Sequence, residues 1–171
     1  MLLWHMGAAV AIVYVTLGRA RIDYRWILVG AVAPDLIDGL MNVAFLDEPS
    51  SRGPAHSIAA VVVVAVGVLL LTRGERRLGM FGLAVGWLLH LVADGMWAWP
   101  ETFLWPAFGP SFSVIPGEPY SWDLLTDPLG RWSTWATELA GLAVLAWFWV
   151  AFRLGEPERR RRFLRDGRLR A

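Results

Sequence analysis

Residues 86–99 read GWLLHLVADGMWAW, an apolar stretch that carries two ionisable side chains, His90 and Asp94. A spacing of four places these side chains one above the other on a single face of a helix. The apolar surroundings predict a helix inside a membrane, where an ionisable group is costly unless it has a partner. The stretch therefore predicts a functional site, and its partners are expected among the other His and Asp residues of the chain.

The composition indicates a single membrane-embedded domain over residues 1–171. Of the 171 residues, 56% are hydrophobic, and the mean hydropathy is +0.46, which is too apolar for an ordinary soluble domain. The chain has no cysteine. Disulfides and thiolate metal sites are therefore excluded, and any metal must bind to His, Asp, Glu or backbone oxygen.

Apolar runs of the length that a bilayer requires occupy about residues 1–17, 26–45, 56–72, 79–99 and 133–152. The first run is expected to be a retained helix, because no basic residue precedes it and no convincing cleavage site follows it. Pro34 is expected to kink the second run. The predicted fold class is an all-α integral membrane bundle of about five transmembrane helices, with a long outer loop over residues 100–132.

The arginines predict the orientation of this bundle. All 16 basic residues are arginine. Fourteen of them fall in the first loop, the third loop and the tail, and only Arg52 and Arg131 fall on the other side. The positive-inside rule then places the C-terminus in the cytoplasm and the N-terminus outside, in a multi-pass protein of the inner membrane. The basic tail at residues 153–171 is expected to contact anionic lipid of the inner leaflet through its charge. Nucleic acid would use the same charges, but the sequence shows no folded nucleic-acid-binding module.

Six residues of metal-ligand type fall in the outer half of the predicted membrane region, judged by the rise of about 1.5 Å per helical residue. They are His5, Asp35, Asp38, His56, His90 and Asp94. Buried carboxylates must be paired or must bind a metal, and nearly all arginines lie on the opposite side. A divalent cation is therefore expected. Ligation by His and Asp favours zinc, with manganese or iron as alternatives.

Several of these residues also have a simpler interpretation. His5 could be a polar anchor at the membrane interface, and His56 an ordinary residue of a helix start. Asp35 could also stand at a helix start, and Asp38 could pair with a hydroxyl group. Glu138, the only charged residue within the fifth run, could be a general base, a residue that orients a ligand, or an interfacial side chain.

Four motifs carry a resemblance to a known family. They are WH at residues 4–5, APDLID at 33–38, RGPAHS at 52–57 and HLVADGMWAWPETFLWP at 90–106. These motifs resemble the membrane-bound metal-dependent hydrolases, LexA-regulated inner-membrane hydrolases of bacteria. The resemblance implies a catalytic metal held by the six residues named above. Two motifs depart from the family: Ser51 replaces the first His of an HRGxTH pattern, and PDLID replaces PDxD. The first departure implies one ligand fewer or a water in its place.

The functional prediction is a metal-dependent hydrolase that acts on a phosphoester or other ester at the lipid headgroup level. A metal-activated water would attack, with Asp38 or Glu138 as the base. One alternative is a metal or proton transporter, although the inner halves of the runs are apolar. The other is a structural membrane protein in which the same residues join helices. Membrane lipid is the expected partner, and the sequence predicts no oligomeric state.

Overall fold

The computed structural model describes residues 1–17, 22–45, 52–113 and 132–168, and all regular elements in these ranges are helical. The α-helices are α1 (Leu2–Leu17), α2 (Tyr24–Gly30), α3 (Ala33–Phe45), α4 (Ile58–Leu71), α5 (Gly74–Ala93), α6 (Pro100–Phe103), α8 (Trp132–Ala151) and α9 (Pro157–Asp166). Two 3-10 turns, η1 (Pro54–His56) and η2 (Met96–Ala98), stand before α4 and after α5. The predicted all-α class is confirmed for the described residues.

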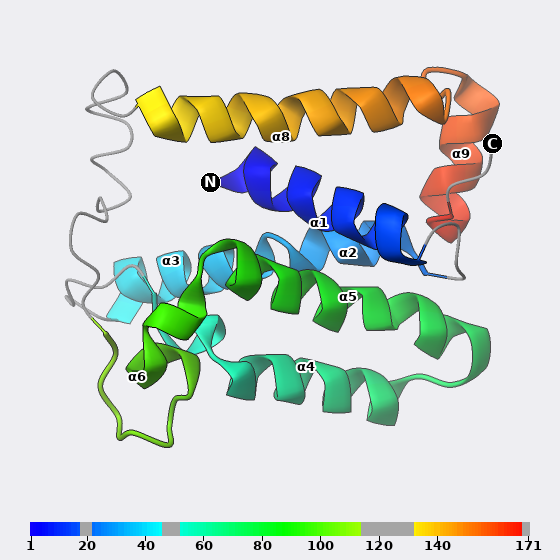
Figure 1. Cartoon of the computed structure of the whole chain (residues 1–171). Coiled ribbons are helices and arrows are strands. Elements are labelled where there is room, and N and C mark those ends of the chain that lie inside the picture. Colours follow the sequence, from blue (N-terminus) through cyan, green and yellow to red (C-terminus); the bar gives the residue numbers. More distant parts are fainter. Residues whose placement is uncertain (18–21, 46–51, 114–131, 169–171) are drawn as a thin grey trace.

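The long helices run alongside one another in a bundle (Figure 1). Helix α2 packs against α5, α1 packs against α8, and α4 packs against α5. The N-terminus, α3 and α6 lie at one end of the bundle, whereas α9 and the connection between α4 and α5 lie at the other (Figure 1). The arginines of residues 73–77 and of α9 are thus separated from α3 by the length of the bundle.

Glycines allow α2 and α5 to approach until their backbones touch. A Cβ atom on Gly86 would lie 2.2 Å from the carbonyl oxygen of Ile27, and one on Gly30 would lie 2.1 Å from that of Leu83. Small residues of this kind are typical of helix contacts in membranes, where close van der Waals packing drives association. This contact fixes the position of α5 relative to the end of α2.

The predicted second run is two helices, because a turn at residues 31–32 separates α2 from α3. Pro34 lies in the first turn of α3, where its missing N–H group costs least. The expected kink is therefore confirmed, in the stronger form of a break. Ala31 is the C-cap of α2, so its carbonyl oxygen belongs to the group that has no partner within the helix.

The predicted fourth run is correct in its centre and wrong at both ends. Helix α5 begins at Gly74, within the expected loop, and it ends at Ala93 and not at Trp99. Asp94 is the C-cap, and Gly95 follows with a φ of 64°, the left-handed conformation that commonly ends a helix. Asp94 therefore lies at the end of α5 and not in its interior.

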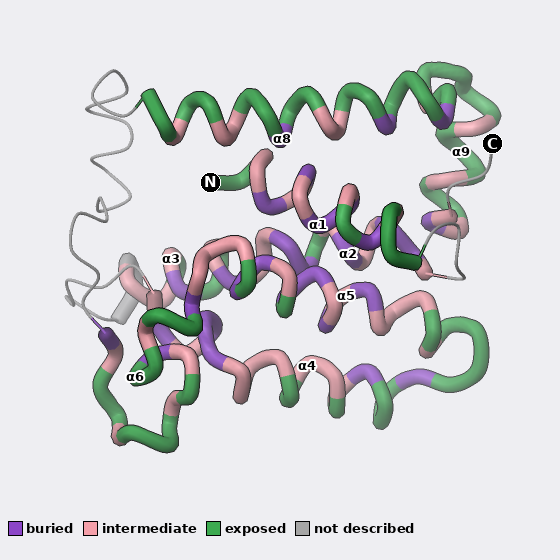
Figure 2. Tube along the Cα trace, viewed as in Figure 1, coloured by how far each residue is buried: buried purple, intermediate pink, exposed green. Residues whose placement is uncertain are grey.

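The bundle leaves many apolar side chains exposed, among them Leu139 and Val150 of α8. Figure 2 shows that most of α8 is exposed or half-buried. Helix α4 has no charged residue, and only Val68 of it is buried, while Val63 and Leu70 are 70% and 77% exposed. Such a helix suits lipid and not water. Of the described helices, α8 alone is long and apolar enough to cross a membrane unaided, while α1 and α4 are shorter apolar helices. The prediction of five spans is therefore not confirmed by helix length.

Candidate metal centre

Asp38 orients the His56 ring through a hydrogen bond with its Nδ1 atom. The Nδ1 atom of His56 lies 2.6 Å from the Oδ2 atom of Asp38, and both side chains are buried. Asp38 also accepts hydrogen bonds from the backbone N–H groups of Gly53 (2.7 Å) and Ala55 (3.0 Å). Because the carboxylate is the acceptor, His56 donates its Nδ1 hydrogen to it. The Nε2 atom of a neutral His56 ring then carries a free lone pair.

His90 is oriented in the same way by the helix break. Its Nδ1 atom lies 2.8 Å from the carbonyl oxygen of Ala31, which can only accept. His90 therefore donates its Nδ1 hydrogen, and its Nε2 atom also presents a lone pair when the ring is neutral. The close packing of α2 on α5 is what brings this carbonyl to His90.

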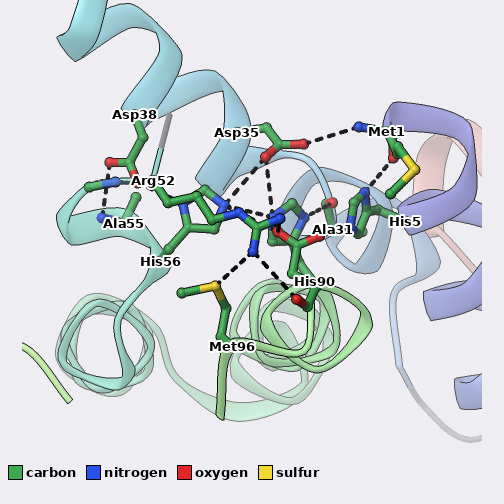
Figure 3. A network of polar contacts seen from close by, with 12 residues as sticks. Met1, His5, Ala31, Asp35, Asp38, Arg52, Ala55, His56, His90 and Met96 are labelled. Carbon is green, nitrogen blue, oxygen red and sulfur yellow. Dashed lines mark hydrogen bonds and ion pairs between the residues drawn. The ribbon is translucent and has the colours of Figure 1, made fainter. Parts of the chain in front are cut away.

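The two Nε2 atoms converge on one point together with an oxygen of Asp35 (Figure 3), and an oxygen of Asp94 reaches the same point. The Nε2 atoms of His56 and His90 are 3.2 Å apart. The Oδ1 atom of Asp35 lies 3.4 Å from each of them, and the Oδ2 atom of Asp94 lies 3.6 Å from each. All four atoms lie within 4.8 Å of one another. Three elements contribute: His56 comes from η1, His90 and Asp94 from the end of α5, and Asp35 from the start of α3.

The spacing of the four atoms fits a small divalent cation. Ligands at about 2.0–2.2 Å from a tetrahedral zinc ion are separated from each other by roughly 3.3–3.6 Å. The separations that involve a histidine nitrogen, 3.2–3.6 Å, are close to this size. The donor set of two imidazoles and two carboxylates suits zinc, manganese or iron. These four residues could therefore hold a divalent metal ion, as the sequence predicted.

His5 lies beside this group and contacts it through Asp94. Its Nε2 atom lies 2.8 Å from the Oδ1 atom of Asp94, and its Nδ1 atom contacts the carbonyl oxygen of Met1. The His5 ring also stacks on the His90 ring, with 4.1 Å between centroids. His5 is thus placed to orient Asp94 and His90, while the Oδ2 atom of Asp94 faces the other two histidines.

Arg52 corrects one step of the sequence argument, which assumed that no arginine could reach the acidic residues. Its Nη2 atom lies 3.2 Å from the Oδ2 atom of Asp94, and its Nη1 atom donates to the Asp94 carbonyl oxygen at 3.4 Å. Nη1 also contacts the sulfur of Met96 (Figure 3). The sequence could have indicated this contact, because Arg52 lies four residues before His56 and on the side of the membrane that is poor in arginine.

Asp38 and Glu138, the two residues expected as bases, are not among the four residues whose atoms converge. All three bonds of Asp38 point to η1 and its preceding residue, so Asp38 stands behind His56. Glu138, on α8, accepts a hydrogen bond from the backbone N–H of Leu3 at 2.8 Å. It thereby satisfies a donor at the start of α1, where the first N–H groups lack partners.

The outer loop is described only at its start. Glu101 in α6 is exposed, and its nearest described partner is the hydroxyl of Ser113 at 3.5 Å. Ser113 in turn donates its backbone N–H to Thr102 at 2.8 Å, which closes this first part of the loop. The rest of the long outer loop, residues 114–131 with Arg131 at its end, lies outside the described residues.

Comparison with known families adds one finding to this geometry. The model of the YdjM inner membrane protein family matches residues 3–158, which include all four candidate ligands. The chain belongs to the YdjM family. A search of curated proteins found no match, and neither did a search of solved structures.

Membership of the YdjM family gives the location of the chain, which is the inner membrane. The predicted location is therefore confirmed, and the exposed apolar side chains of α4 and α8 have lipid as their natural surroundings. The family match also confirms that the chain belongs to a family of inner-membrane proteins, as the resemblance implied. The family description names no activity.

Proposed function

We propose that this member of the YdjM family is a metal-dependent hydrolase that acts on an ester, foremost a phosphoester, at the lipid headgroup level. The observation that carries the proposal is the convergence of the His56 and His90 lone pairs with one oxygen each from Asp35 and Asp94. Two imidazole lone pairs repel each other unless a cation lies between them. The buried carboxylate of Asp94 also favours a positive charge there.

The ion would be held by His56, His90, Asp35 and Asp94, with zinc as the expected ion and manganese or iron as alternatives. A divalent cation in such a site supplies Lewis acidity and makes water a better nucleophile near neutral pH. Asp38 keeps the His56 lone pair directed at the site, and the Ala31 carbonyl does the same for His90.

Substrate would reach the site past Asp35. Asp35 is the exposed member of the group, at 36% of its side chain, while the two histidines are fully buried. The neighbouring residues of α3 are apolar and exposed, with Leu40 at 70%. A molecule with a polar head and an apolar tail would meet both features together, and this supports a lipid-like substrate.

Arg52 supports a phosphoester over a neutral ester. Its guanidinium contacts Asp94 at the site, and its side chain is only 14% exposed. Guanidinium groups bind phosphate oxygens in a fixed, two-pronged geometry. In this role Arg52 would hold the anionic group of the substrate next to the four ligand atoms. The Arg52→Lys variant keeps the charge and loses the two-pronged geometry, so it separates these contributions.

The proposed topology has five spans, with the metal centre near the outer face and the C-terminus in the cytoplasm. The second span would be formed by α2 and α3 together, and the third by η1 and α4. The arginine-rich segments lie at the end of the bundle opposite to α3, which supports this orientation (Figure 1).

The transport alternative is less well supported, because the bundle interior below the site is apolar. A cluster of buried apolar side chains that includes Val10, Val13, Ile27 and Phe148 lies in that region. A relay of ions or protons needs polar groups along its path. The structural alternative gains some support from the many contacts among the histidines and aspartates, and metal analysis separates it from catalysis.

The test is an activity screen on protein purified in mild detergent and loaded with zinc or manganese. The substrates are phosphatidate, phosphatidylglycerol phosphate and a neutral diacylglycerol ester. The proposal expects hydrolysis of at least one phosphoester, loss of this activity in His90→Ala, and a reduced rate in Arg52→Lys with the metal content unchanged. Equal rates in the wild type and in His90→Ala would refute it.

A further inference from the structure

A cavity lies at the α9 end of the bundle, away from the metal centre and on the side that the proposed topology places in the cytoplasm. It has a volume of about 240 Å³ and is lined by side chains from α1, α2, α8 and α9. Its apolar lining includes Val10, Leu28, Leu145, Phe148 and Phe163. A water molecule occupies about 30 Å³ in the liquid, so this space could hold several methylene groups.

The wall formed by α9 is fixed to the rest of the bundle. The backbone N–H of Tyr24 donates to the carbonyl oxygen of Gly167 at 2.8 Å, just after the end of α9. Arg25 donates to the carbonyl oxygen of Leu164. Helix α9 is therefore joined to the start of α2, and the cavity between them is part of the folded structure.

The charge at the cavity has one sign. Of the described residues that line it, Arg160 is the charged one. Among the described residues no acidic side chain forms an ion pair with Arg160, whereas Glu156 pairs with Arg159 at 3.2 Å. Three further arginines, at positions 161, 162 and 165, stand on the same helix. Basic helices at the cytoplasmic face attract anionic lipids.

We propose that this cavity binds one acyl chain of an anionic phospholipid from the cytoplasmic leaflet, with the phosphate group at Arg160. An acyl chain matches the apolar lining, and a phosphate matches the guanidinium at its edge. Trp149, which also lines the cavity and is 47% exposed, suits the interface between tail and headgroup. Bound lipid would fasten α9 to the membrane surface. This site is separate from the hydrolase proposed above.

The test is a titration of the full chain in mild detergent with dioleoyl phosphatidylglycerol, followed by native mass spectrometry, with dioleoyl phosphatidylcholine as the neutral lipid. We expect one tightly held phosphatidylglycerol and weaker retention of phosphatidylcholine. Arg160→Gln should weaken phosphatidylglycerol binding about fivefold, the equivalent of roughly 1 kcal/mol for one arginine near an anionic surface. Arg162→Gln is the matched control, because it removes the same charge from α9 without touching the cavity lining.

Two cavity-filling variants, Leu28→Trp and Leu145→Phe, test the acyl-chain part of the proposal. Either variant should lose the tightly held lipid while its circular dichroism spectrum and metal content match the wild type. Two variants are used because one of them could fail to fold. Equal losses in Arg160→Gln and Arg162→Gln, or equal binding of both lipids, would overturn the proposal in favour of unspecific surface attraction.

Discussion

The Nε2 atoms of His56 and His90 face each other at 3.2 Å, although neither neutral ring has an Nε2 hydrogen to share. His56 gives its Nδ1 hydrogen to Asp38, and His90 gives its Nδ1 hydrogen to the Ala31 carbonyl. Two acceptors at this distance need a positive charge between them. The same point is reached by Asp35 and Asp94, so a divalent cation there satisfies all four residues.

Asp38→Asn tests the role of Asp38 as the residue that orients His56. An amide has one acceptor oxygen, and so it cannot accept the three hydrogen bonds that Asp38 receives. We expect metal affinity to fall by about 10- to 100-fold, which is typical when a residue that hydrogen-bonds to a metal ligand is replaced. Binding should not disappear. Isothermal titration with zinc measures it. Complete loss of binding in a folded variant would make Asp38 a direct ligand.

Gly86→Ala tests whether close packing of α2 on α5 supports the metal centre. The new methyl group would lie 2.2 Å from the Ile27 carbonyl oxygen, so the helices must separate. We expect a loss of about 1–3 kcal/mol in stability and weaker metal binding, because His90 moves away from Ala31. Thermal unfolding in detergent measures the first effect.

Gly67→Ala is the control for this variant. A Cβ atom at Gly67, in the middle of α4, meets no atom within 4 Å. Alanine in a helix interior is favoured over glycine by up to about 1 kcal/mol, so this variant should unfold at the same temperature or a higher one. If Gly67→Ala and Gly86→Ala unfolded at the same temperature, the contact between α2 and α5 would not matter for stability.

Glu138→Gln separates a structural role from a catalytic one. Glu138 accepts the N–H of Leu3 at 2.8 Å, and its loss of charge should cost about 1 kcal/mol of stability. Glu138 is not one of the four candidate ligands, and among the described residues it reaches Asp35 only through the N-terminal amine of Met1, which lies 4.0 Å from Glu138 and 3.8 Å from Asp35. A structural role therefore predicts an unchanged metal content and an unchanged rate per folded molecule. A rate lower by a hundredfold or more at full metal content would instead support the general base expected from the sequence.

Cysteine labelling tests the orientation, because the chain has no cysteine of its own. Ser111 and Glu158 are both exposed, the first beyond α6 and the second in α9. A membrane-impermeant maleimide added to spheroplasts should label Ser111→Cys directly and Glu158→Cys only after permeabilisation. The reverse pattern would place the metal centre at the cytoplasmic face.

The part of the site that could be predicted from the sequence is the part set by local geometry. His90 and Asp94 are neighbours because they are four residues apart, and the helix end at Gly95 leaves that relation intact. Asp35 could be predicted as a site residue because it is a charged residue directly after a proline in an apolar run. The meeting of these residues with His56 could be expected only from their shared depth in the membrane.

The roles within the site depend on contacts that no spacing reveals. Asp38 and Asp35 look equivalent in the sequence, yet one lies behind His56 and the other faces His56 and His90. The difference arises because the chain from Gly53 to Ala55 turns its N–H groups toward Asp38. The contact between Arg52 and Asp94 likewise requires that η1 be folded beside the end of α5.

Metal content tests the central claim most directly. Elemental analysis of protein purified in mild detergent should compare the wild type with the His90→Ala, Asp94→Ala double variant. Gly67→Ala is the control, because it is a substitution away from the metal centre that goes through the same purification. The account predicts close to one zinc or manganese ion per chain in the wild type and in Gly67→Ala, and its loss in the double variant. An equal metal content in all three, or no metal in any of them after reloading, would contradict it.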